Sequence, residues 1–175
     1  ISSPDIIHKT EAKGVFLNVK NEKEVSDAYT RLIHNAKQYK KSAKSEGILI
    51  QQQLTGKEVI VGAKHDLQFG PVLMFGLGGI FVEVLKDVSF RLVPVERKDV
   101  KEMISEIKGF ALLKGTRGER PVHFGKLEDF LLGVSRMVEK VPLKELDLNP
   151  VFANEKGCWA ADARISALRE DGMGV

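Results

Sequence analysis

Residues 145–165, ELDLNPVFANEKGCWAADARI, contain two short apolar runs separated by a polar turn. We predict that the runs around Asn149 and Asp162 are strands, and that the turn at 154–157 folds them into a hairpin. Such a hairpin brings an amide oxygen and a carboxylate oxygen side by side. Mg²⁺ is usually held by one or two protein oxygens while the phosphates of a substrate supply others. The pair therefore predicts the metal end of a metal–nucleotide site.

Upstream of this hairpin, the sequence predicts further strands joined by short turns. The apolar and β-branched runs lie at 48–54, 58–66, 72–75 and 90–95, and the first three are separated by glycine-containing turns. Short turns between such runs favour antiparallel pairing. An earlier run, GVFLNV at 14–19, alternates enough to predict another strand.

Three segments carry apolar residues at helical spacing. The first follows Asn21, which has capping-box spacing to Glu24. The predicted apolar faces are Val25, Ala28, Tyr29, Leu32, Ile33 and Ala36; Val100, Met103, Ile104, Ile107 and Ala111; and Leu127, Phe130, Leu131, Val134 and Val138. Grouped strands with helices in this order predict an α+β fold, an antiparallel sheet flanked by helices, rather than a doubly wound parallel sheet.

Composition narrows the class of protein. The 175 residues suffice for one domain, or for two small subdomains that share a nucleotide cleft. A net charge of +3 without a basic block argues against nucleic-acid binding. A single cysteine excludes an intrachain disulfide framework. No run has membrane-spanning length and no signal peptide is visible, so we expect a cytoplasmic protein. Because the chain opens on Ile1 without a methionine, we expect a fragment or a preceding segment.

The glycine-rich segment FGLGGI at 75–80 is a candidate phosphate loop. Gly76, Gly78 and Gly79 would let backbone N–H groups approach an anion closely. The segment has neither the Gly-Lys-Ser/Thr of a Walker loop nor the full Rossmann spacing. An ordinary turn at a strand end explains it equally well.

Charged and polar residues nearby are further candidates for nucleotide contacts. Lys64 and His65 point to opposite faces of their predicted strand, so only one of them can face a given ligand. Lysine is the better candidate for binding phosphate. Arg91 would neutralise phosphate if its strand faces the cleft, and a surface charge is the equal alternative. Glu83 follows the glycine segment. The run Gln51, Gln52, Gln53 and Leu54 is either an exposed edge or linker, or a strand between subdomains that offers backbone groups to adenine.

His8, in the segment SPDIIHK, is the candidate catalytic residue. A lone histidine is more often structural or simply exposed. A near-neutral imidazole can nevertheless act as a nucleophile and carry a covalent group. Lys9 and Asp5 are near enough in sequence to orient it or to balance a phosphoryl charge.

Together these segments resemble the ATP-grasp domain of the β subunits of ADP-forming acetyl-CoA synthetases. The resemblance runs from the first residue to about Ile165, and succinyl-CoA synthetase β chains are more distantly similar. The segments that carry it are SPDIIHK at 3–9, KEVIVGAKHDLQFGP at 57–71, MFGLGGIFVEVLKDVSFRLVPV at 74–95, LLKGTRGERP at 112–121, and ELDLNPVF with AADARI at the C-terminal end.

The resemblance implies an acid–CoA ligase that works through a phosphohistidine relay. In such enzymes a CoA-binding α subunit forms an acyl phosphate, and the phosphoryl group passes through an α-subunit histidine to the nucleotide. His8 would be a second carrier, so that acyl-CoA, ADP and phosphate give ATP and the acid. Mg²⁺ would be held by Asn149 and Asp162, with ADP or ATP against the glycine segment 76–79 and adenine against 51–54. The expected assembly is an α2β2 heterotetramer.

The resemblance also implies a partial ATP-grasp fold. Residues 1–50 would be the remainder of the first subdomain, with the His8 loop, and residues 51–175 the second, with the nucleotide and metal site. The family's phosphate-binding lysine comes from a strand upstream of SPDIIHK, so we expect this chain to hold part of the site. The alternatives are a catalytically silent ATP-grasp module, a succinyl-CoA synthetase β-like subunit, or an ATP-grasp carboxylate–amine ligase.

Overall fold

The computed structural model describes residues 1–7, 9–79, 85–116 and 118–168. The chain divides into two compact units, Ile1–Gln53 and Leu54–Val175, and each is described by itself. No helix among the described residues is both long enough and apolar enough to cross a membrane.

The first unit is built on one helix, α1 (Glu22–Tyr39). Asn21 caps it as predicted, because its side-chain oxygen accepts the Glu24 N–H at 3.0 Å. The buried face of the helix packs against the N-terminal segment, in a cluster of Ile1, Ile6, Ala12 and Ala36. Tyr29 was predicted on this face and is instead 53% exposed.

Two predicted strands of this unit, at 14–19 and 48–54, are not strands in the structure. A strand exists only where a neighbouring backbone completes its hydrogen bonds, and neither run has such a partner among the described residues. Asn18 and Gln53 make contact between the two runs: the Asn18 backbone N–H donates to Gln53 Oε1 at 2.6 Å, and Gln53 Nε2 donates to Asn18 Oδ1 at 3.1 Å. Apolar side chains in both runs are exposed, among them Leu17 at 67% and Ile50 at 71%.

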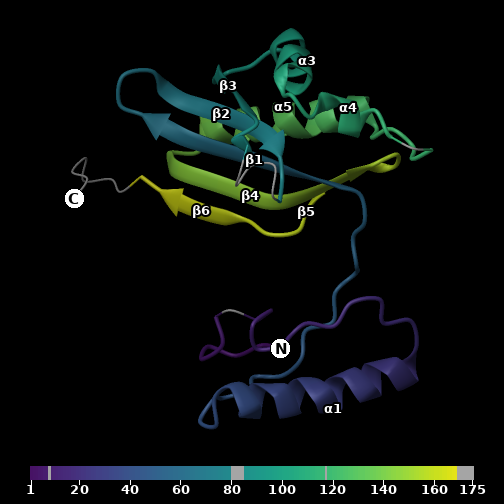
Figure 1. The fold of residues 1–175 in the computed structure, drawn as a ribbon. Coiled ribbons are helices and arrows are strands. Elements are labelled where there is room, and N and C mark those ends of the chain that lie inside the picture. The colour runs from purple at the N-terminus through teal and green to yellow at the C-terminus, as the bar shows by residue number, and fades with distance from the viewer. Residues whose placement is uncertain (8, 80–84, 117, 169–175) are drawn as a thin grey trace. The chain divides into compact units, whose positions relative to one another are not determined.

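The second unit contains a six-stranded antiparallel sheet, which confirms the predicted sheet (Figure 1). Its strand order is β3-β2-β1-β4-β5. The strand β6 also pairs with β4, along a different stretch of that strand from β5. The third strand begins earlier and ends earlier than the predicted run at 90–95. The strands are β1 (Lys57–Asp66), β2 (Gly70–Leu77), β3 (Val88–Leu92), β4 (Leu143–Asn154), β5 (Gly157–Ala160) and β6 (Arg164–Ala167).

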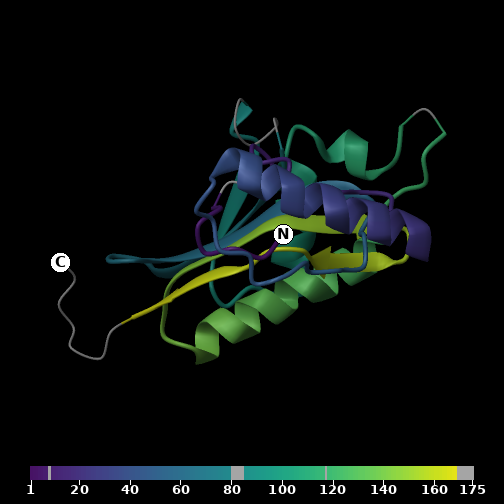
Figure 2. The same ribbon diagram turned by 90° about the horizontal axis from the view of Figure 1, so that it is seen from below.

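Three helices of this unit, α3 (Arg97–Glu106), α4 (Phe110–Leu113) and α5 (Phe124–Lys140), lie on one side of the sheet (Figures 1 and 2). Ala111, predicted on the second helix, lies in α4 because α3 ends at Glu106. Alternate strand residues and the apolar helix faces form one core, including Val59, Val61, Phe75, Met103, Leu127, Leu131, Leu146 and Val151. Among the described residues of this unit, none of the three helices lies on the other face of the sheet, which we call the open face.

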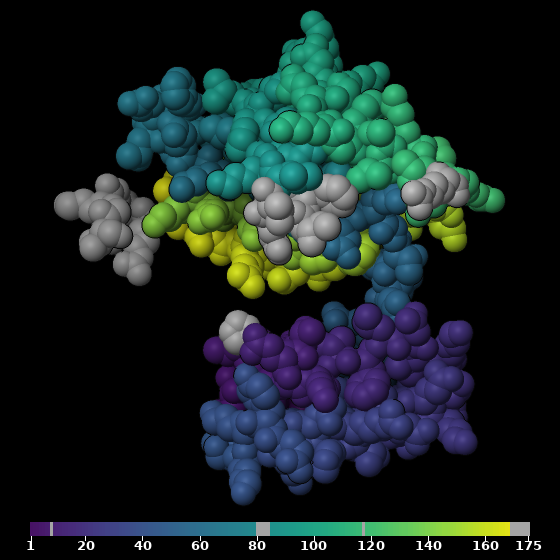
Figure 3. Space-filling model, viewed as in Figure 1, coloured from purple at the N-terminus to yellow at the C-terminus, as the bar shows by residue number. Residues whose placement is uncertain are grey.

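The β1–β2 hairpin projects from the rest of the unit (Figure 3). Asp66 closes its turn by accepting the Gln68 and Phe69 N–H groups at 2.8 and 2.9 Å, and these bonds lower the pKa of its carboxyl. Leu67 at the tip is 99% exposed.

A buried carboxylate ties the start of β3 to the helical layer. Asp87 is 5% exposed and accepts the backbone N–H groups of Lys108 and Gly109, each at 2.7 Å. Glycine at position 109 allows this close approach, because a Cβ there would lie 2.0 Å from Leu77 Cδ1 and force that side chain to move. The turn between α3 and α4 therefore packs directly on the sheet.

Arg91 on β3 makes a second link to the helical layer. Its Nη1 donates to Glu106 Oε2 on α3 at 2.9 Å, and its Nη2 donates to the other oxygen of the same carboxylate. This fork raises the pKa of Arg91 and lowers the pKa of the Glu106 carboxyl.

Replacing Asp87 by Asn should destabilise the second unit. The amide keeps one acceptor oxygen and turns an NH₂ group toward a backbone N–H, so a loss of about 2 kcal/mol is expected in urea unfolding. Glu139→Gln, the same chemical change on the exposed side of α5, is the control. Equal unfolding midpoints for the two variants would contradict the assigned role.

Replacing Glu106 by Gln should reduce stability at neutral pH and matter less in acid. The folded-state pKa of Glu106 lies below its ordinary value of 4.5, so its ion pair stabilises the fold above that pH and is lost as pH falls through the lowered pKa. Urea midpoints of the wild type and the variant should differ at pH 7 and converge near pH 3. A difference that is constant over this range would refute the assignment.

Candidate functional site

Rows of side chains cross the open face of the sheet, because residues paired across antiparallel strands point to the same side. Two such rows pass through β1, one at Lys64 and the other at Gly62. The first row is Leu92, Val72, Lys64, Glu145 and Ser166, and the second is Phe90, Met74, Gly62, Asp147 and Arg164. Both rows run from apolar residues on β2 and β3 to charged or polar residues on β4 and β6.

A third row contains the two predicted metal ligands. Val151 pairs with Ala160, and Asp147 pairs with Arg164, so the ladders on both sides of the break between β5 and β6 share one register. Continued through the break, this register places Asn149 opposite Asp162. The chains stay joined there, because the Ala161 N–H donates to the Pro150 carbonyl at 2.9 Å.

The backbone around this pair departs from regular strand geometry. Val59 pairs with Val151 and Val61 with Leu148, so β4 carries one extra residue at Asn149–Pro150. Such bulges redirect side chains and are frequent beside active sites. Asp162 was predicted in a strand and lies instead in the bend between β5 and β6.

The donor groups of this pair fit a hard cation. Asn149 and Asp162 are both exposed. Asp162 Oδ1 accepts the Ala163 N–H at 3.0 Å, and its Oδ2 lies 4.0 Å from Arg164 Nε. An amide and a carboxylate oxygen suit Mg²⁺, which keeps several waters or phosphate oxygens in its shell. Within residues 1–7, 9–79, 85–116 and 118–168, no group of three or more His, Cys, Asp or Glu residues offers a competing metal site.

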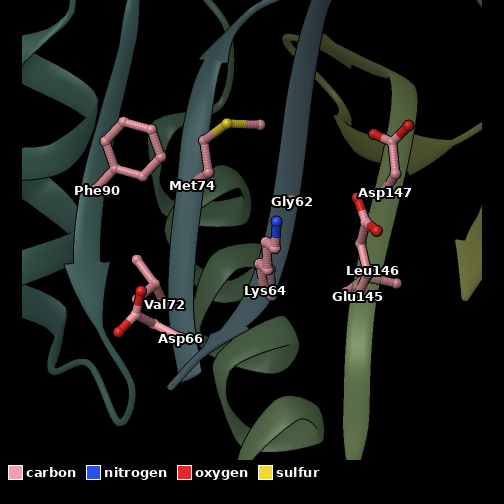
Figure 4. A pocket seen from close by; sticks show the side chains of 10 residues that line it. Gly62, Lys64, Asp66, Val72, Met74, Phe90, Glu145, Leu146 and Asp147 are labelled. Carbon is pink, nitrogen blue, oxygen red and sulfur yellow. The ribbon is translucent and has the colours of Figure 1, made fainter. Parts of the chain in front are cut away.

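A pocket of about 490 Å³ lies on the open face, and its lining reaches Asp147, two residues before Asn149 on β4. Figure 4 shows Lys64 between the apolar side chains of β2 and β3 and the carboxylates of Glu145 and Asp147 on β4. No ion pair engages Lys64 among the described residues. The pocket is lined by Gly62, Ala63, Lys64, Asp66, Val72, Met74, Phe90, Glu145, Leu146 and Asp147.

Asp147 and Glu145 are site residues that the sequence interpretation did not include. They precede Asn149 by two and four residues on the same strand, and strand alternation puts the side chains of Glu145 and Asp147 on one face. The alternating positions of Glu145 and Asp147 were the signal in the sequence from which these two site residues could have been predicted. Within the two rows described above, the acidic side chains lie on β4 and the cationic ones are Lys64 and Arg164.

The prediction that Arg91 faces the nucleotide cleft is wrong. Arg91 lies one residue out of phase with Phe90, which lines the pocket, and it is bound to Glu106 on the helical side of the sheet. The choice between the two faces depended on the register of β3, which the sequence pattern does not give.

Close packing accounts for two of the glycines. A Cβ on Gly76 would lie 2.6 Å from the Asp87 carbonyl oxygen, and one on Gly78 would lie 3.2 Å from the Glu58 backbone. Gly79 has a φ of +60°, a conformation that favours glycine. A contact of this segment with phosphate stays a prediction.

The remaining predicted residues are not gathered at this face by the described structure. His8 and Glu83 lie outside the described residues. Gln51, Gln52, Gln53 and Leu54 form no strand at the junction of the two units, and their contact with adenine stays a prediction.

Asp5, predicted to orient His8, serves another purpose. Its carboxylate binds Lys40 Nζ at 2.8 Å and accepts the Lys44 N–H at 2.9 Å. These contacts, the lysine side chain first, lower the pKa of Asp5. Asp5 therefore fixes the segment after α1. Because His8 lies outside the described residues, an orienting contact from Asp5 to His8 stays a prediction.

Known proteins match almost the whole chain. An ATP-grasp domain family model matches residues 1–167. The β subunit of acetate–CoA ligase [ADP-forming] I from Pyrococcus furiosus is 49% identical over 167 residues, which cover 94% of this chain and 72% of that protein.

Two solved structures of acetyl-coenzyme A synthetase 1 from Ca. Korarchaeum cryptofilum have the same fold. One, in complex with coenzyme A and Ca-AMPCP, has a TM-score of 0.81 and 45% identity, and the match covers 95% of this chain and 73% of that one. The other has a TM-score of 0.78 and 40% identity, with coverage of 96% and 74%. It holds coenzyme A and Mg-AMPPCP, with its phosphohistidine segment pointing towards the nucleotide-binding site. The chain thus belongs to the ATP-grasp family and, within it, to the β subunits of ADP-forming acetate–CoA ligases.

Proposed function

We propose that the open face of the second unit binds Mg–ADP or Mg–ATP, and that the chain passes a phosphoryl group between a phosphohistidine and this nucleotide. With a CoA-binding α subunit, this transfer makes ATP and an acid from acyl-CoA, ADP and phosphate. The observation that carries the proposal is the register that sets Asn149 opposite Asp162 beside the Lys64 pocket.

Asn149 and Asp162 are the residues that would hold Mg²⁺. Two protein oxygens leave most of the coordination shell to phosphate and water, which is the arrangement Mg²⁺ favours in nucleotide sites. The bound ion would neutralise charge on the phosphates as the phosphoryl group moves.

Lys64 would act on the phosphates from the same face. Figure 4 shows its ammonium reaching along β1 toward Gly62, which is the direction of the metal pair. An ammonium without an ion-pair partner is available to bind an anion, and phosphoryl transfer depends mostly on positioning and neutralising charge.

His8 would carry the phosphoryl group. When a terminal oxygen of ADP attacks the phosphorus of phosphohistidine, the P–N bond breaks, a P–O bond forms, and the imidazole leaves. The neighbouring residues support a carrier segment with one fixed end, since Ile6 is 1% exposed while Ile7 is 82% exposed. The phosphohistidine segment of the similar Korarchaeum enzyme lends further support.

The proposal also includes a partner subunit. The related proteins are β subunits, so we propose a CoA-binding α subunit as partner, in an α2β2 heterotetramer in the cytoplasm. The two units Ile1–Gln53 and Leu54–Val175 would be the remainder of the first ATP-grasp subdomain and the second subdomain.

Replacing Asp162 by Asn in the full-length protein should weaken binding of Mg–ADP by about tenfold to 100-fold, because a charge-assisted metal contact is lost. Isothermal titration without metal should show little change in binding of free ADP. Glu155→Gln, a matched change in the β4–β5 turn, should leave both affinities unaltered. An equal loss for ADP with and without Mg²⁺ would argue against a metal-binding role for Asp162.

Replacing His8 by Ala in the assembled enzyme should lower ATP synthesis from acetyl-CoA, ADP and phosphate by about 100-fold or more. Labelling with acetyl-CoA and ³²P-phosphate should give acid-labile label on this chain in the wild type and none in the variant. His34→Ala, on α1, is the control. Undiminished ATP synthesis by the His8 variant would sink the carrier role, and an inactive wild-type assembly would favour a silent module.

A further inference from the structure

We propose that Arg164 is a positioning residue that disfavours free Mg²⁺ at the Asn149–Asp162 pair and turns to the phosphates when the metal arrives with nucleotide. This inference rests on the proposed function of that pair. It assigns to the site a preference for metal–nucleotide over bare cation.

The register places Arg164 among the acidic residues of the open face. It begins β6 and pairs with Asp147 on β4, so its side chain shares the side of Asp147 in the sheet. It also follows Asp162 by two residues along the chain. Its Nε lies 4.0 Å from Asp162 Oδ2. A guanidinium therefore stands beside the proposed metal ligand.

This contact is loose in comparison with the other arginine pairs of the unit. The side chains of Arg164 and Asp162 are 82% and 59% exposed, whereas that of Arg91 is 23% exposed and forms a fork with Glu106. Exposed pairs at this separation contribute little, since solvent screens them and both side chains keep their freedom. Arg164 can thus leave Asp162 at small cost.

Charge gives the direction of the exchange. A guanidinium beside Asp162 repels a bare divalent cation, because both are positive. Mg–ADP carries net negative charge and brings phosphate oxygens, which the planar fork of arginine matches in a bidentate manner. Arg164 therefore opposes the first ligand and favours the second.

The test uses Arg164→Gln in the full-length protein, with Mn²⁺ as the probe for free cation. Electron paramagnetic resonance without nucleotide should show Mn²⁺ binding tightened by about fivefold, because the repulsion is gone. Titration with Mg–ADP should show affinity lowered by about tenfold, because the charge-assisted contacts to phosphate are gone. Arg164→Lys should keep near-wild-type Mn²⁺ binding and still lose part of the Mg–ADP affinity.

Arg136→Gln, an exposed arginine on α5, is the control and should change neither affinity. If Arg164→Gln shifts both affinities in the same direction, or neither, the inference is overturned. Asp162→Asn separates this from failure of the metal pair. If Asp162→Asn loses Mn²⁺ binding but Arg164→Gln has no effect, only the role of Arg164 is refuted. If Asp162→Asn binds Mn²⁺ as the wild type does, both the metal-binding role of the pair and the role of Arg164 are refuted.

Discussion

The pairing of β4 with strands on both of its sides is the constraint on which the rest of this unit depends. Its side-chain period is two, so a shift of one residue in register exchanges the two faces. The extra residue at Asn149–Pro150 makes that exchange within the strand: Glu145 and Asp147 face the open side, whereas Val151 and Ala153, also odd-numbered, lie in the core. Because of this bulge, one strand presents polar side chains to the open face before Asn149 and apolar side chains to the core after Pro150.

The charged residues on the two faces of the sheet have different roles: those on the helical side stabilise the fold, and those on the open side are proposed to bind ligand. On the helical side, apolar residues are supplemented by a few engaged charges, as Asp87 receives two backbone N–H groups and Arg91 is held by Glu106. On the open side, Lys64 has no ion pair among the described residues and Arg164 only a loose one. Both of these cations lie on the face where an anionic ligand is proposed to bind.

Much of this arrangement was predictable from local sequence. The helices and the strands of the second unit followed from periodicity and turns. The two-residue turn at Glu155–Lys156 fixes Asn154 opposite Gly157, and counting back along both strands already sets Asn149 opposite Asp162. Here the site geometry is a local property of one hairpin.

The failures have a different physical origin, since they concern properties that depend on distant parts of the chain. The apolar runs at 14–19 and 48–54 have strand composition but pair with no backbone in the part of the chain that the structure describes, and composition alone does not make a ladder. Arg91 was assigned to the wrong face because the register of β3 depends on its pairing with β2. The contacts of Asp5 with residues 35 and 39 positions away were likewise not visible in the local sequence.

The bend that carries Asp162 has one more consequence, for solubility. Along this side of β4 it divides the outer strand into β5 and β6, of four residues each. A long, straight outer strand is a template for unwanted pairing with other chains, and short or interrupted ones are a common protection against aggregation. The same break that frees Asp162 for a ligand therefore also denies a foreign strand a continuous ladder.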